Sequence, residues 1–228
     1  MILVFDLDDT LYDEMTFVRS GFLAVAAYGQ SEWGWDAEES NTVMLDILAR
    51  EGRGAVFDRW LALHDAGGAG RVKDCVRAYR HHDPEIRLLD VSTELLRTLK
   101  SDHTLYIVTD GHKVVQANKI AALDVEKRVS KAYITHRYGI HNAKPSTHCF
   151  ELIKNKESCS WSDMAYIGDN PAKDFVNLNP LGVHTIRVLT GSHRDVRAKA
   201  GYDARHTIPN LEHFAALLKQ LQTQREQA

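Results

Sequence analysis

The sequence MILVFDLDDTLYDE at residues 1–14 decides the fold. Its four consecutive apolar residues, at positions 2–5, are typical of a short strand that is buried on both faces, as the strands of a parallel sheet are. Asp6, Asp8 and Asp9 follow at once, and carboxylates crowded in this way repel one another unless a cation lies among them. The stretch therefore predicts a parallel sheet whose first strand ends at a site that attracts positive charge.

The length and composition narrow the class of protein. The 228 residues suffice for one large domain or for one domain with an insertion, and 44% hydrophobic with 26% charged residues is ordinary for a globular protein. A net charge of −3 without any Lys/Arg block argues against a nucleic-acid-binding protein. No apolar stretch is long enough to span a bilayer and no basic segment precedes the first strand, so we expect a cytoplasmic protein that begins at Met1 and makes no membrane contact.

The cysteines and histidines do not show the spacing of a zinc site. Cys75, Cys149 and Cys159 are odd in number and form no CxxC pair, so we interpret them as reduced thiols. The twelve histidines lack a supporting cysteine or an HExxH spacing. We therefore interpret nearly all of them as surface or packing residues.

The apolar pattern changes along the chain. Residues 13–82 contain no convincing strand, and their pattern predicts amphipathic helices at 16–28, 37–49, 54–64 and 71–81. From about residue 83 onward, strands alternate with helices. The strands are predicted at 105–108, 132–135, 165–168, 183–188 and 206–208. The helices are predicted at 93–100, 113–123, 147–154, 171–176 and 211–222, with a polar tail from Thr223 that is expected to fray.

This alternation predicts an α/β fold, in which a Rossmann-like parallel sheet is flanked by helices. The first strand belongs to that sheet, because an isolated parallel strand of four residues has nothing else with which to pair. The helical stretch between is then an insertion. We predict an α/β core formed by residues 1–12 and 83–228, and an all-helical domain formed by residues 13–82 on two linkers.

Three of the predicted strands end in polar side chains, which are Asp6 with Asp8, Thr109, and Asp169. Ligands of open parallel sheets bind in the crevice outside this edge. Each residue alone also has a structural explanation: the first two aspartates as turn formers, Thr109 as a loop hydroxyl, and Asp169 as the N-cap of the next helix. Their convergence on one edge favours a functional site.

At these positions the sequence resembles the haloacid dehalogenase (HAD) superfamily of phosphohydrolases, over nearly the whole chain. DLDDT matches the nucleophile loop DxDxT of the family, and the threonine of VTDG matches its second motif. Lys144 in NAKPS matches the third motif, and GDNPAKD, with Asp169 and Asp174, matches the acidic fourth. The helical insertion is similar to the C1-type cap of this family. Two positions depart from the usual pattern: Asp110 stands where Asn is frequent, and Ser146 where a second Pro is common.

The resemblance implies a Mg²⁺-dependent phosphoric monoester hydrolase that acts through an aspartyl-phosphate. A carboxylate can attack a phosphate dianion only if a cation neutralises the site, and Mg²⁺ prefers oxygen ligands. Asp6 would be the nucleophile and Asp8 the general acid and base. The Asp6 and Asp169 carboxylates and the Asp8 backbone carbonyl would hold the metal.

The remaining motif residues would act on the phosphate. Thr109 and Lys144 would hold the phosphoryl oxygens, and Asp110 would alter the hydrogen bonding at one of them. Asp174 would orient Lys144 or a metal-bound water.

Substrate choice would come from the helical cap, because the core residues read only phosphate and metal. Candidate contacts for the leaving group in the cap are Arg19, Trp33, Trp35, Arg53, Trp60 and Arg80, although aromatic residues at helical spacing more often form the core of a domain. Asp9, Tyr12 and Asp13 are equally well explained as turn or cap residues. We expect a small phosphorylated metabolite as the partner, either a sugar phosphate, a nucleotide or a phospho-acid. The oligomeric state is left open.

Two other functions fit the same motifs. A phosphomutase would pass the phosphoryl group from the aspartate to a second substrate hydroxyl. A non-catalytic binding protein on this fold would have lost at least one motif residue, and none is lost here. Asp8 argues against a dehalogenase, which needs no protonating acid at that position.

Overall fold

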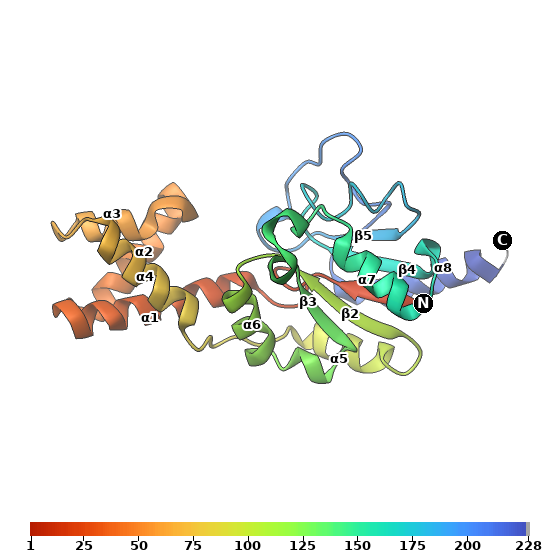
Figure 1. The fold of residues 1–228 in the computed structure, drawn as a ribbon, viewed down its shortest axis with the longest axis horizontal. Helices are drawn as coiled ribbons and strands as arrows, with labels where there is room; N and C mark the ends of the chain where they lie inside the picture. The colour runs from red at the N-terminus through yellow and green to blue at the C-terminus, as the bar shows by residue number, and fades with distance from the viewer. Residues whose placement is uncertain (227–228) are drawn as a thin grey trace. The chain divides into compact units, whose positions relative to one another are not determined.

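The computed structural model describes residues 1–226, and the chain divides into two compact units (Figure 1). One unit combines Met1–Glu14 with Arg87–Ala228, and the other spans Met15–Ile86. Within the described residues, no helix combines the length and the apolar character needed to cross a membrane.

The first unit is built on a parallel sheet with the strand order β3-β2-β1-β4-β5-β6. The strands are β1 (Ile2–Phe5), β2 (Thr104–Thr109), β3 (Lys131–Ile134), β4 (Met164–Gly168), β5 (His184–Val188) and β6 (His206–Ile208). β1 lies between β2 and β4, with Ile2 opposite Thr104 and Met164. A central strand with helices on both faces has no solvent-facing side, which is why all four of its residues are apolar and buried. The predicted fold class, a Rossmann-like parallel sheet flanked by helices, is confirmed.

Helices cover both faces of this sheet (Figure 1). On one face, Val4 packs in a buried cluster with Phe150 and Ile153 of α7 (His148–Glu157). On the other face, the ring of Phe5 lies 5.9 Å from that of Phe214, the first residue of α8 (Phe214–Glu226). The other helices of this unit are α5 (Asp90–Leu99) and α6 (Lys113–Ala122). Successive side chains of β1 thus pack on opposite faces of the sheet, against α7 on one face and α8 on the other.

The second unit contains helices and no strand among its described residues. Its helices are α1 (Glu14–Trp33), which begins one residue before the unit, α2 (Ala37–Glu51), α3 (Val56–Ala62) and α4 (Ala69–His81). The Asp36 carboxylate caps α2 by accepting a hydrogen bond from the Glu39 N–H at 2.7 Å. Trp60 is fully buried against α1, where a Cβ at Gly29 would lie 2.8 Å from the indole. Trp60 therefore packs inside the unit, as its helical spacing favours.

One predicted helix is wrong. Residues 171–176 form turns and bends instead. The Asn170 side chain accepts from the Ala172 N–H at 2.9 Å, and Asp174 accepts from the Asn170 N–H at 2.9 Å. With no helix here, the N-cap explanation of Asp169 also fails.

The C-terminal helix is longer than predicted. α8 continues to Glu226 instead of ending at Gln222. Residues 227–228, where the predicted tail ends, lie outside the described part of the chain. All three cysteines are free, as predicted.

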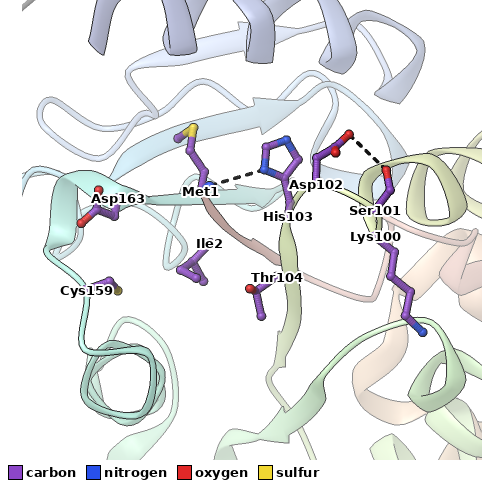
Figure 2. Close-up of a pocket in the computed structure, with 9 residues that line it drawn as sticks. All are labelled: Met1, Ile2, Lys100, Ser101, Asp102, His103, Thr104, Cys159 and Asp163. Carbon is purple, nitrogen blue, oxygen red and sulfur yellow. Dashed lines mark hydrogen bonds between the residues drawn. The ribbon is translucent and has the colours of Figure 1, made fainter. Parts of the chain in front are cut away.

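A cavity of about 500 Å³ opens at the amino edge of the sheet (Figure 2). It is lined by Met1 and Ile2 at the start of β1, by residues 100–104 before and at the start of β2, and by Cys159 and Asp163. The motif residues follow the carboxyl ends of the same strands. This cavity is therefore separate from the site described next.

Candidate active site

The carboxyl ends of β1, β2 and β4 bring the predicted acidic residues together. Asp6 continues the ladder of β1, since its N–H donates to the Ile167 carbonyl of β4 at 2.8 Å. Asp169 follows the last residue of β4 directly. Oxygen atoms of Asp6, Asp169 and Asp174 lie within 4.8 Å of one another, and all three residues are buried. A glycine precedes Asp169 because a Cβ at Gly168 would lie only 2.6 Å from the Asp174 carboxylate.

Lys144 lies inside this acidic group. Its ammonium is 2.9 Å from Asp6 Oδ1 and 2.8 Å from Asp174 Oδ1, and the lysine side chain is only 1% exposed. The ammonium also donates to the Tyr166 hydroxyl at 2.9 Å, which in turn donates to Asp174 at 3.1 Å. The charge of Lys144 is thus held between the predicted nucleophile and the last acid of the fourth motif.

The group contains more negative than positive charge. Burial raises the pKa of Asp6 to about 6, although the Lys144 ammonium opposes the shift. Burial together with repulsion from Asp6 raises the pKa of Asp169 to about 9. A divalent cation among these oxygens would remove the repulsion, and carboxylate oxygens are the ligands that Mg²⁺ prefers. The donor set therefore fits Mg²⁺.

Asp8 lies in a different environment. Its carboxylate accepts hydrogen bonds from the Tyr12 hydroxyl and the Lys119 ammonium, both at 2.6 Å, and from the Gln116 amide at 2.8 Å. Burial is the largest influence and would raise the pKa of Asp8, but the Lys119 charge and the hydrogen bonds from Lys119, Tyr12 and Gln116 together outweigh it, so the pKa lies below its ordinary value. The Gln116 amide also donates to the hydroxyl of Thr109. Asp8 thus faces α6 and the end of β2.

Asp110 contacts protein groups with both carboxylate oxygens. One oxygen accepts from the Thr135 hydroxyl and from the Lys144 backbone N–H at 3.0 Å, and the other lies 3.2 Å from the Lys173 ammonium. Burial is the largest influence and would raise the pKa of Asp110, but the charges of Lys173 and Lys144 and the hydrogen bonds from Thr135 and the Lys144 backbone together lower it. In this arrangement the Asp110 carboxylate fixes the loop that carries Lys144.

Sequence reasoning missed several residues around the predicted ones. Gln116 and Lys119 are three positions apart on one predicted helix, so the sequence could have shown that they share a face of that helix. Tyr166 lies inside a strand whose apolar pattern gives no hint of a polar role. Lys173 lies within the acidic fourth motif, where only the acids were considered.

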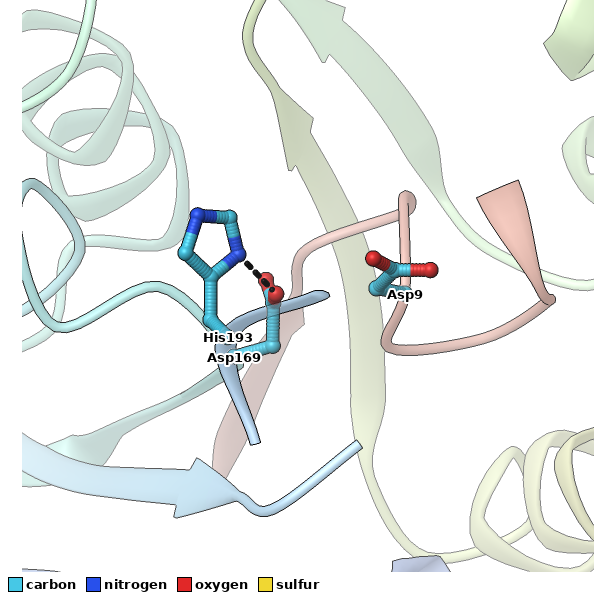
Figure 3. Close-up of side chains that lie close together, drawn as sticks. All are labelled: Asp9, Asp169 and His193. Atoms are coloured by element: carbon cyan, nitrogen blue, oxygen red, sulfur yellow. Dashed lines mark hydrogen bonds and ion pairs between the residues drawn. The ribbon is translucent and has the colours of Figure 1, made fainter. Parts of the chain in front are cut away.

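His193 is a further residue that the sequence did not reveal. Its Nδ1 lies 2.8 Å from Asp169 Oδ2 (Figure 3). His193 is thus a histidine with a specific polar partner among the buried acids. Asp9, left open between a structural and a functional role, accepts from the Glu14 N–H at 3.0 Å and from the Ser192 N–H at 2.9 Å. Tyr12, also left open, hydrogen-bonds Asp8.

Two curated relatives extend over most of this chain. Glyceraldehyde 3-phosphate phosphatase of Methanocaldococcus jannaschii is 25% identical over 226 residues, covering 96% of this chain and 97% of its own. The enzyme of the same name from Methanothermobacter thermautotrophicus is 25% identical over 215 residues, covering 87% and 91%.

A solved structure shares the fold at lower identity. A HAD hydrolase of Bacillus subtilis, solved with bound magnesium, is 16% identical with a TM-score of 0.65 and covers 95% of this chain and 97% of its own. A family model for HAD-like hydrolases matches residues 141–214, and the model for haloacid dehalogenase-like hydrolases matches residues 1–176. Since the latter match takes in the buried acids, Lys144 and the whole helical unit, this protein belongs to the haloacid dehalogenase-like hydrolase family.

Proposed function

We propose that this protein is a Mg²⁺-dependent phosphatase that hydrolyses small phosphate monoesters through an aspartyl-phosphate on Asp6. The observation that carries the proposal is the buried group of Asp6, Asp169 and Asp174 around the single ammonium of Lys144. The names of the two archaeal relatives and the magnesium in the Bacillus subtilis structure support it.

The proposed chemistry has two steps. In the first, an Asp6 oxygen bonds to phosphorus while the ester oxygen leaves, and Asp8 supplies the proton that the leaving alkoxide takes. In the second, Asp8 removes a proton from a water that attacks phosphorus, which releases inorganic phosphate and frees Asp6. Bound Mg²⁺ would neutralise the carboxylates and the phosphate so that two anions can approach. Asp6, Asp169 and the Asp8 carbonyl would hold it, and Lys144 and Thr109 would bind phosphoryl oxygens.

We also propose residues 13–82 as a C1-type cap that selects the leaving group. The compact helical unit, Met15–Ile86, contains none of the motif residues. Since the archaeal relatives are named for a triose phosphate, a three-carbon phosphate is the first substrate to test among sugar phosphates, nucleotides and phospho-acids.

The test is a phosphate-release assay on a panel of phosphorylated metabolites that includes glyceraldehyde 3-phosphate. We expect activity with Mg²⁺, loss with EDTA, and recovery when Mg²⁺ is returned. Full activity in metal-stripped protein would contradict the metal site. Turnover that depends on a bisphosphate activator, without release of phosphate, would identify a phosphomutase.

The same panel tests the cap. Arg19→Ala and Arg80→Ala should raise KM for the preferred metabolite and affect acetyl phosphate much less, because acetyl phosphate offers little leaving group to bind. Arg59→Ala is the matched control, since this exposed arginine of the same unit pairs with Glu51 on the surface. Equal losses on both substrates would show that these arginines serve the phosphoryl chemistry itself.

A further inference from the structure

The segment between β5 and β6 is tied to the loop that carries the nucleophile. We call residues 190–193 the strap. The Thr190 hydroxyl donates to the Asp9 carbonyl at 2.5 Å, and the Ser192 N–H and hydroxyl donate to the Asp9 carboxylate at 2.9 and 3.1 Å. Gly191 has a φ of 59°, and a Cβ there would overlap the Asp9 carboxylate. Only glycine permits the strap to lie this close to Asp9.

A buried arginine holds the far end of the strap. Arg187 of β5 is 4% exposed, and its Nη2 donates to the His193 carbonyl at 2.8 Å and to the Val196 carbonyl at 2.6 Å. Its Nη1 lies 3.3 Å from the Asp203 carboxylate. The guanidinium is a rigid planar fork, so these contacts fix the backbone on which His193 is carried. They do not depend on the His193 side chain.

The strap places the His193 imidazole against Asp169. Nδ1 lies 2.8 Å from Asp169 Oδ2 (Figure 3). The imidazole is half-buried. Asp9 approaches the same place but directs its oxygens to Ser192 and Glu14. A hydrogen bond to a carboxylate restricts its rotation, and partners of this kind around a metal ligand typically change metal affinity.

We propose that His193 is a positioning residue that orients Asp169 toward the divalent cation, and that the strap holds it in place. The inference rests on the proposed Mg²⁺ site. Because Arg187 and Asp9 fix the backbone of the strap, removing the imidazole should loosen Asp169 and leave the strap folded.

The test is calorimetric titration of Mg²⁺ into metal-free protein. We expect His193→Ala to weaken Mg²⁺ binding by roughly 10-fold or more. His193→Asn should recover most of the affinity, because the amide of Asn reaches the position of Nδ1. Arg197→Ala, an exposed residue of the same segment, is the control. At about 0.15 M salt the lost charge is screened and binding should stay close to that of wild type.

Activity provides a second readout. The loss of activity in His193→Ala should be repaired by saturating Mg²⁺, which a folding defect would not allow. Wild-type protein that binds no Mg²⁺ would overturn the proposed metal site. Wild-type protein that binds Mg²⁺, with His193→Ala binding equally well, would overturn the role of His193 alone. Equal weakening in the Ala and Asn variants would also overturn it, because the hydrogen bond would then be irrelevant.

Discussion

Asp6 and Asp8 are two positions apart in the sequence, and their surroundings shift their pKa values in opposite directions. Asp6 lies near the carboxylates of Asp169 and Asp174, and burial raises its pKa to about 6 although the Lys144 ammonium opposes the shift. Burial would also raise the pKa of Asp8, but the charge of Lys119 and the hydrogen bonds from Lys119, Tyr12 and Gln116 together hold it below its ordinary value. Neighbouring carboxyl groups whose environments separate their pKa values are typical of a division between catalytic roles.

This difference predicts distinct defects for the two asparagine variants. Asp6→Asn should abolish turnover and leave the fold intact, because an amide cannot attack phosphorus. Asp8→Asn should still form the aspartyl-phosphate with p-nitrophenyl phosphate, whose leaving group needs no proton, but should hydrolyse it slowly. Acid quench and mass spectrometry would locate the trapped phosphate. Phosphate found on serine or histidine would contradict the assignment of Asp6.

At the scale of single residues, the sequence was sufficient to predict the site residues that belong to motifs. It was not sufficient to predict residues that reach the site only through tertiary packing. Asp6, Asp169 and Lys144 follow or lie near strand ends, so adjacency in a parallel sheet predicts that they meet. Tyr166 and His193 belong to no motif. Their contacts depend on which way a strand side chain points and on how a long loop returns to the sheet.

At the scale of elements, α6 presents two donors to Asp8 at the carboxyl edge of the sheet. Gln116 and Lys119 share one face because they are three residues apart, and both contact Asp8. Gln116 also joins Asp8 to Thr109 at the end of β2. A helix that begins just after the second motif thus controls the proposed general acid and base.

Lys119→Met should therefore move the pH–rate profile. Removing the ammonium removes the charge that lowers the pKa of Asp8, so its pKa rises. Hydrolysis of the aspartyl-phosphate needs ionised Asp8, so the acid limb of kcat for p-nitrophenyl phosphate should shift to higher pH. Lys113→Met, at the exposed start of the same helix, should leave the limb in place. Identical profiles for the Lys119 variant and wild type would contradict this role of Lys119.

The strands were predictable because fully buried parallel strands give short, unbroken apolar runs. The absence of a helix at 171–176 was not predictable, because the pattern of apolar residues is the same whether Asp174 points to solvent or inward. In the folded chain Asp174 is held inward by Lys144 and Tyr166, and the local backbone forms turns around it. The backbone conformation of residues 171–176 therefore depends on tertiary contacts with residues that are distant in the sequence.

At the scale of the whole molecule, the acidic group weakens the fold when no cation is bound. Burying carboxylates together raises the free energy of their ionised forms, so the folded chain retains a proton that the unfolded chain releases. For Asp169 the pKa is about 9 in the folded state, against about 3.9 for an unperturbed aspartate. Between these values the folded state binds more protons than the unfolded state, so its stability falls as pH rises toward 9.

Thermal unfolding of metal-free protein between pH 7 and pH 9 should show this dependence. If the folded state retains one proton that the unfolded state releases, the free energy of unfolding falls by up to about 1.4 kcal/mol per pH unit. Asp169→Asn should have a shallower slope, because the amide does not titrate. The thiols of Cys75 and Cys149, whose pKa values burial raises to about 11, contribute the same sign in both proteins, and the difference between the two slopes therefore isolates Asp169.

Mg²⁺ should counteract the loss of stability at high pH in the wild-type protein but not in Asp169→Asn. The cation replaces the retained proton, so its stabilisation should be greater at pH 9 than at pH 7, where it must first displace that proton. In Asp169→Asn, which lacks one proposed ligand, Mg²⁺ should raise the unfolding temperature little at either pH. Equal slopes in the two metal-free proteins would show that Asp169 is already ionised at pH 7. The repulsion inferred at the carboxyl edge of the sheet would then be balanced by charges within the protein, with no need of a metal.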